Sequence, residues 1–208
     1  MAVQFHLTAD EMSTLRREAS ARQARNRQAQ SVDKILARGD PASVLFERDL
    51  MGLMGEYALL VKLFNLPYAE DYFVQDQWAK THDFTINGVS GEIRTRTHAG
   101  YSFYSLTPQM RSDIGVVAYL VDGITDTGRV AFPGWLTKET FAEHRYVARE
   151  RHPNWKGTGY LIGDKYLEPI ESLWEYLHPN CLQEQPTSVV EEVRKVSKLS
   201  AALKRFLV

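Results

Sequence analysis

Residues 81–97 read THDFTINGVSGEIRTRT, two short runs of alternating apolar and polar residues on either side of Asn87-Gly88. This pattern predicts a β-hairpin with a two-residue type I′ turn, because both turn positions need a positive φ that Asn and Gly tolerate. A two-residue loop also sets the register, since opposed residues then have numbers that sum to the same value. The hairpin is therefore expected to place Asp83 opposite Glu92.

The alternation along the two strands gives this hairpin one apolar face and one polar face. The apolar side chains are those of Phe84, Ile86, Val89 and Ile93. The polar face carries Asp83 and Glu92 together with Arg94 and Arg96. We therefore expect one face to cover the core and the other to line a polar cleft.

The opposed carboxylates of Asp83 and Glu92 predict a metal site. Their β-carbons should lie about 5 Å apart, where like charges repel unless a cation lies between them. Hard oxygen ligands at this spacing suit Mg²⁺ or Mn²⁺, which keep several waters and accept a phosphate oxygen. A cation beside the guanidinium groups of Arg94 and Arg96 is typical of a phosphodiester site. The alternative is an exposed hairpin with a solvated charged face.

The sequence around the hairpin predicts one α/β core. Residues 49–64 carry apolar side chains at helical spacing, which indicates a buried helix, and residues 114–121 form an apolar run that suits a central strand. Further short elements are expected at 72–75, 129–132 and 160–162 as strands and at 137–144 as a helix. Thr107 followed by Pro108 predicts the start of a crossover helix before the central strand.

Asp83, an eight-residue gap and the triplet Glu92-Ile93-Arg94 resemble the signature of the PD-(D/E)XK nuclease superfamily. The order of elements over residues 50–136 is similar to the αβββαβ core of these restriction-endonuclease-like and phage-type enzymes. The resemblance implies a mixed central sheet flanked by helices and a Mg²⁺-dependent endonuclease acting on DNA. It also implies that an earlier helix supplies a glutamate to the metal. Here that residue is Glu56, so the implied ligands are Asp83, Glu92 and Glu56, although Glu56 can equally lie at the edge of an apolar stripe.

Two positions depart from the family pattern. His82 stands where the family has proline, at a loosely defined position, and Arg94 stands where it has lysine. Arginine stays protonated and cannot act as a base, so Arg94 is expected to steady an oxyanion instead. This substitution favours a second hypothesis, a catalytically impaired nuclease-fold protein that binds DNA or RNA without cutting.

Gln109 lies where the crossover helix is expected to begin, near the open end of the implied site. A helix N-terminus favours anions, so Gln109 is a candidate for holding the attacking water or a phosphate. An ordinary surface position is an equal alternative for this residue.

The chain is expected to comprise an N-terminal helical extension (1–40), a nuclease-like core (41–180) and a C-terminal amphipathic helix (181–208). The extension has a basic row that is a candidate nucleic-acid contact, with a solvated helix face as an equal alternative. Its members are Arg16, Arg17, Arg22, Arg25 and Arg27. The C-terminal helix is able to serve assembly, which leaves an interaction module as a third class.

The 208 residues include 25 Lys and Arg against 26 Asp and Glu, a net charge of −1. A nucleic-acid partner must therefore be held by a local basic surface. The single Cys181 excludes an intramolecular disulfide and a multi-cysteine zinc site. No apolar run suits a membrane span and the N-terminus lacks the order of a secretion signal, so the cytoplasm of a bacterial or phage-infected cell is expected. A homodimer is expected because cutting two antiparallel strands suits a two-fold enzyme.

Overall fold

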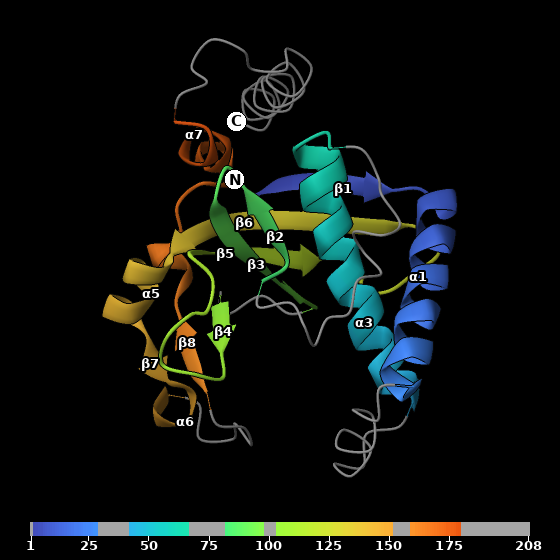
Figure 1. The fold of residues 1–208 in the computed structure, drawn as a ribbon, viewed down its shortest axis with the longest axis horizontal. Coiled ribbons are helices and arrows are strands. Elements are labelled where there is room, and N and C mark those ends of the chain that lie inside the picture. The colour runs from blue at the N-terminus through green and yellow to red at the C-terminus, as the bar shows by residue number, and fades with distance from the viewer. Residues whose placement is uncertain (1, 29–41, 67–81, 98–102, 152–158, 180–208) are drawn as a thin grey trace, which may run out of the picture.

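The computed structural model describes residues 2–28, 42–66, 82–97, 103–151 and 159–179 (Figure 1). These residues form a mixed β-sheet flanked by helices, which confirms the predicted α/β class. Several expectations lie outside the described residues: the strand at 72–75, the C-terminal helix, and both domain boundaries.

The main sheet of the described chain has five strands in the order β1-β6-β5-β3-β2. They are β1 (Val3–Leu7), β2 (Phe84–Ile86), β3 (Val89–Arg96), β5 (Ile114–Leu120) and β6 (Gly128–Thr137). β3 and β5 run parallel, and the other neighbouring pairs are antiparallel. A smaller antiparallel sheet has the order β4-β8-β7, with β4 (Phe103–Ser105), β7 (Tyr146–Val147) and β8 (Tyr160–Ile162).

Two long helices lie side by side at one end of the main sheet (Figure 1). They are α1 (Ala9–Gln28) and α3 (Ala42–Tyr57), and α3 continues as the π-helical segment η1 (Ala58–Leu63). This confirms the buried helix expected from residue 49, with an earlier start. The shorter helices are α5 (Lys138–His144), α6 (Ala148–Arg151), η2 (Asp164–Tyr166), η3 (Ile170–Ser172) and α7 (Leu173–Leu177). None of the helices described here has the length and apolar content needed to cross a bilayer.

The β2–β3 hairpin has the predicted turn, and it has the predicted register from Phe84 to Ile86; the expected pairing of Asp83 with Glu92 is not among its strand pairs. Asn87 and Gly88 both have positive φ, 49° and 83°, as a type I′ turn requires. Ile86 pairs with Val89 and Phe84 with Gly91. Gly91 has a physical reason to be glycine, because a β-carbon there would overlap the Phe84 ring.

Both faces of the main sheet are buried, by two different sets of side chains. Along β5, Val116 joins the cluster formed with α1 and α3, whereas Val117 joins a second cluster with Phe103 and Phe141. Ile93 on β3 faces α3. The next side chains along β3 therefore point to the opposite face, toward β4.

The predicted crossover helix between β4 and β5 is wrong. Residues 106–113 form a series of bends. The Thr107 hydroxyl donates to the carbonyl of Gln109 at 2.5 Å and so does not cap a helix. Asp113 accepts hydrogen bonds from the N–H and the hydroxyl of Ser90, at 2.9 and 2.7 Å, and fixes the end of the loop to β3. These local side-chain bonds offer the backbone an alternative to a helix.

The N-terminal segment, predicted as a helical extension, contains a strand as well as a helix with one buried face. β1 pairs with β6 in the main sheet, a strand that the sequence analysis did not predict. The α1 helix begins with a capping box: Thr8 N–H donates to Glu11 Oε2 at 2.8 Å and Glu11 N–H donates to Thr8 Oγ1 at 3.3 Å. Met12 and Leu15 on α1 are fully buried, which explains why this helix packs on α3.

Candidate active site

Asp83 lies immediately before β2, at the edge of β3. Its N–H donates to the Gly91 carbonyl at 2.8 Å, which extends the hairpin one residue beyond the pair that ends at Phe84. Its carboxylate Oδ2 accepts from the Ile93 N–H at 2.6 Å. Because the described part of β2 ends here, this carboxylate takes the place of a neighbouring strand for that backbone donor. The Asp83 side chain is thus fixed against β3.

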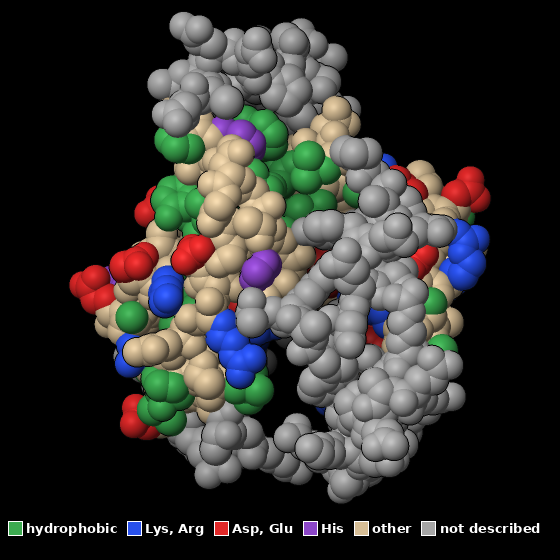
Figure 2. All heavy atoms as spheres, viewed as in Figure 1, with side chains coloured by type: hydrophobic (Ala, Val, Ile, Leu, Met, Phe, Trp, Pro, Cys, Tyr) green, Lys and Arg blue, Asp and Glu red, His purple; other side chains and the backbone are tan. Residues whose placement is uncertain are grey.

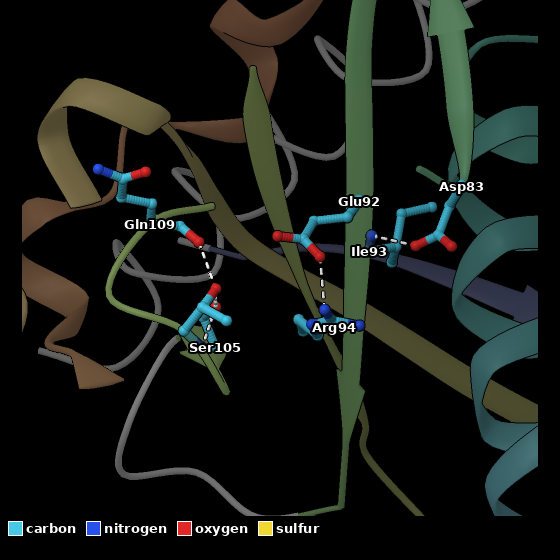
Figure 3. Close-up of polar contacts among 7 residues, drawn as sticks. Asp83, Glu92, Ile93, Arg94, Ser105 and Gln109 are labelled. Atoms are coloured by element: carbon cyan, nitrogen blue, oxygen red, sulfur yellow. Dashed lines mark hydrogen bonds and ion pairs between the residues drawn. The ribbon is translucent and has the colours of Figure 1, made fainter. Parts of the chain in front are cut away.

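Glu92 and Arg94 lie on the same face of β3 and form an ion pair. Arg94 Nη2 donates to Glu92 Oε2 at 2.5 Å. Burial is the largest influence on the pKa of Glu92 and raises it; the Arg94 charge opposes this and the Asp83 charge adds to it, so the pKa stays above its ordinary value. In Figure 3 the Asp83 carboxylate meets β3 from one side, whereas that of Glu92 extends on the other side toward Ser105. The two carboxylates repel each other without facing each other.

Glu56 is joined to Arg22 by a buried, two-pronged ion pair between α3 and α1. Arg22 Nη1 donates to Glu56 Oε1 at 3.3 Å and Nη2 donates to Oε2 at 2.8 Å. The side chains are 4% and 8% exposed. Both oxygens of the carboxylate that was expected to bind the metal therefore accept hydrogen bonds from the Arg22 guanidinium.

Arg22 belongs to the buried stripe of α1 and not to an exposed basic row. The stripe runs through Met12, Leu15, Ala19 and Arg22, all buried. Their spacing of three, four and three residues is that of one helix face. This spacing is visible in the sequence and was the signal that could have separated Arg22 from its arginine neighbours.

One cavity of about 530 Å³ joins these groups. Its walls include Asp83, Glu92 and Arg94 from the hairpin and Glu56 and Arg22 from the two helices. In Figure 2 basic side chains lie at the left edge of a hollow in the lower half of the view. The structure thus brings together the three carboxylates that the sequence analysis selected, although no two of them were adjacent in the sequence.

Two further arginines line the same cavity and were missed from the sequence. Arg48 comes from α3 and Arg111 from the loop between β4 and β5. Arg111 lies close enough to Glu92 for its charge to lower the pKa of that carboxyl against the effect of burial. No local motif marks either residue, because each reaches the cavity only through the tertiary fold.

Some predicted site residues lie elsewhere. Gln109 is exposed in the bends, outside the cavity wall, and Figure 3 shows its side chain directed away from Glu92. Arg96 is half-buried at the end of β3, beyond the residues that line the cavity. Neither side chain is brought to the carboxylates.

The basic residues of α1 are placed in different surroundings. Arg16 is bonded to Asp126 at 2.9 Å and to the Thr125 carbonyl at 3.0 Å, and Arg17 is exposed. The side chains of Arg25 and Arg27 lie outside the part of the chain that is described. Among the members of the row whose side chains are described, Arg22 is buried, Arg16 is half-buried and Arg17 is exposed.

The donor set of the cavity fits a hard divalent cation in its chemistry. Asp83 and Glu92 offer carboxylate oxygens, and Mg²⁺ is commonly held by one or two carboxylates together with waters and phosphate oxygens. Within the described residues no group of three or more His, Cys, Asp or Glu is arranged to hold a metal. Glu56 would join the other two only where Arg22 gives up one of its oxygens.

Comparisons with protein families, with curated proteins and with solved structures find no match for this chain.

Proposed function

We propose that this protein is a metal-dependent nuclease that hydrolyses phosphodiester bonds of DNA, built on a restriction-endonuclease-like core. The observation that carries the proposal is the shared cavity, in which the carboxylates of Asp83 and Glu92 lie among arginines from four separate parts of the fold. Acidic oxygen donors beside guanidinium groups are the composition that phosphoryl chemistry needs.

Asp83 and Glu92 are the residues that would hold Mg²⁺ or Mn²⁺. Such an ion, when bound, polarises a phosphoryl oxygen and promotes deprotonation of a water. Burial raises the pKa of Glu92 and the charge of Asp83 adds to this, so a cation near the two carboxylates would stabilise the ionised form of Glu92.

Arg94 supplies a fixed positive charge beside these carboxylates. Glu92 takes only the Nη2 donor of Arg94, and the Arg94 side chain is 42% exposed, so other guanidinium donors are open to a ligand. A guanidinium with unused N–H donors can bind a phosphate oxygen on which negative charge develops. Because arginine keeps its proton, Arg94 stabilises charge and does not remove a proton from water.

A second candidate function is nucleic-acid binding without cleavage. The observation that favours it is that Glu56 and Glu92 are each neutralised by an arginine of the protein itself. In this case Arg16 and Arg17 of α1 would contact the phosphate backbone of DNA or RNA. For the nuclease, a homodimer would bring two cavities to the two strands of a duplex.

The test is incubation of the purified protein with supercoiled plasmid in Mg²⁺, Mn²⁺ or EDTA. We expect nicked or linear product with either cation, none in EDTA, and almost none for Glu92→Gln. A matched control is Glu143→Gln on α5, whose side chain is 74% exposed and far along the chain from the cavity residues. A Glu92→Gln variant as active as the control would refute the site. Binding without cutting by the wild type would select the second function.

A further inference from the structure

Arg111 has a place in the cavity that neither the motif nor the metal ligands account for. It is exposed, it lines the cavity, and its charge acts on the buried carboxyl of Glu92. Among the described residues its side chain makes no hydrogen bond or ion pair. The guanidinium thus lies in the cavity wall within reach of the Glu92 charge, and its five N–H donors remain available.

Two of the other three cavity arginines, Arg22 and Arg94, differ from Arg111 in this respect. Arg22 gives both terminal nitrogens to Glu56, and Arg94 gives one to Glu92. Their charges are largely cancelled by the carboxylates they touch. An anion that enters the cavity therefore meets in Arg111 a positive charge that no bonded carboxylate cancels.

The backbone on either side of Arg111 is held firmly although its side chain is exposed. Met110 is 2% exposed and packs in the second hydrophobic cluster, and Ser112 is fully buried. Asp113 is tied to Ser90 by three hydrogen bonds of 2.7 to 3.1 Å. An anchored backbone limits the conformational freedom that Arg111 loses when it binds a ligand.

We propose that Arg111 binds a non-bridging phosphate oxygen of the nucleic-acid backbone and holds the phosphodiester on the Glu92 side of the cavity. This inference rests on the proposed function, and it places the phosphate contact on a loop that lies outside the Asp83–Arg94 motif. A guanidinium matches a phosphate group with two parallel N–H donors, which gives the contact direction as well as charge. In this proposal the phosphate is held by Arg111 in the bends of residues 106–113, and not by Gln109 at a helix N-terminus.

The test is binding of a fluorescein-labelled DNA duplex, with Ca²⁺ in place of Mg²⁺ so that binding is measured separately from cleavage. Arg111→Gln should weaken binding about tenfold or more, the scale of one charge-assisted hydrogen bond. It should also reduce the slope of log K against log salt by about 0.9, the value for one lost phosphate contact. Arg111→Lys should keep that slope and part of the affinity, because the charge remains and the fork is lost.

The matched control is Lys165→Gln in η2, which removes one exposed cation that lies over the Tyr166 ring. Its affinity and salt slope should stay at the wild-type values. Equal affinity and slope for Arg111→Gln and this control would overturn the inference, as would a wild type that does not bind the duplex. A wild type that binds through Arg111 but never cuts in Mg²⁺ would leave the inference standing and defeat the proposed nuclease activity.

Discussion

Removal of Arg22 should destabilise the protein strongly, because it leaves the Glu56 carboxylate buried without its partner. The two side chains are 4% and 8% exposed and are joined by two hydrogen bonds. Breaking a buried pair by removing one partner costs about 3–5 kcal/mol. For a chain of this size each kcal/mol shifts the melting temperature by about 2–4 °C. Arg22→Met should therefore melt roughly 6–20 °C below the wild type.

The measurement is thermal unfolding at neutral pH in EDTA, followed by circular dichroism. The double variant Arg22→Met/Glu56→Leu should recover most of the loss, because apolar side chains of similar volume replace both charges. The two single variants and the double variant form a cycle that isolates the coupling between the residues. A single variant that melts within about 2 °C of the wild type, below the shift expected for 1 kcal/mol, would refute the buried pair.

Thermal unfolding with added Mn²⁺ tests whether Glu56 also takes part in cation binding. In Arg22→Met the Glu56 carboxylate no longer has its guanidinium and faces the cavity that holds Asp83 and Glu92. If the cavity takes a cation, Mn²⁺ should raise the melting temperature of Arg22→Met more than that of the wild type. Arg22→Met/Glu56→Leu should not show the larger rise. Equal rises in all three proteins would separate Glu56 from the cation.

Two further predictions concern the hairpin. Burial, and to a smaller extent the charge of Asp83, raises the pKa of Glu92 above its ordinary value of 4.5. The contribution of protonated Glu92 to the stability of the folded protein is therefore complete below pH 4.5 and is lost as pH rises through the higher folded pKa. In EDTA, urea unfolding should show Glu92→Gln gaining stability relative to the wild type over this rise in pH, and parallel pH curves would contradict it. For the proposed nuclease, Arg94→Lys should keep substantial plasmid cleavage and Arg94→Ala should lose about 10²-fold in rate; full activity of Arg94→Ala would move the site away from Arg94.

The hairpin was predictable because all of its determinants are local. Asn87-Gly88 fixes the turn and the register, and the alternation of apolar residues then fixes the faces. The β1 strand was missed for the opposite reason. Its five residues pair with β6, more than a hundred residues away, so no neighbouring turn signals the pairing. Short strands of this kind gain their stability from a distant partner and not from their own sequence.

The loop before β5 shows how one local signal can have two outcomes. Thr107-Pro108 suits a helix start and equally suits a turn. The choice between them depends on Asp113, which bonds to Ser90 on a strand that lies beside it only in the folded protein. The same choice moves Gln109 outward and sets Arg111 in the cavity wall. A site residue was therefore misassigned because an element was misassigned.

The balance of charge in the cavity explains why one additional cation matters there. Glu56 is matched by Arg22 and Glu92 by Arg94, so these four residues contribute little net field. The chain as a whole carries −1 and adds no long-range attraction for a polyanion. A phosphodiester brings a further negative charge close to Asp83, where repulsion is strong because water is partly excluded. Entry of the substrate therefore depends on positive charge that carboxylates have not already cancelled. Arg111 is such a charge within the described chain, and a divalent cation near Asp83 would be another.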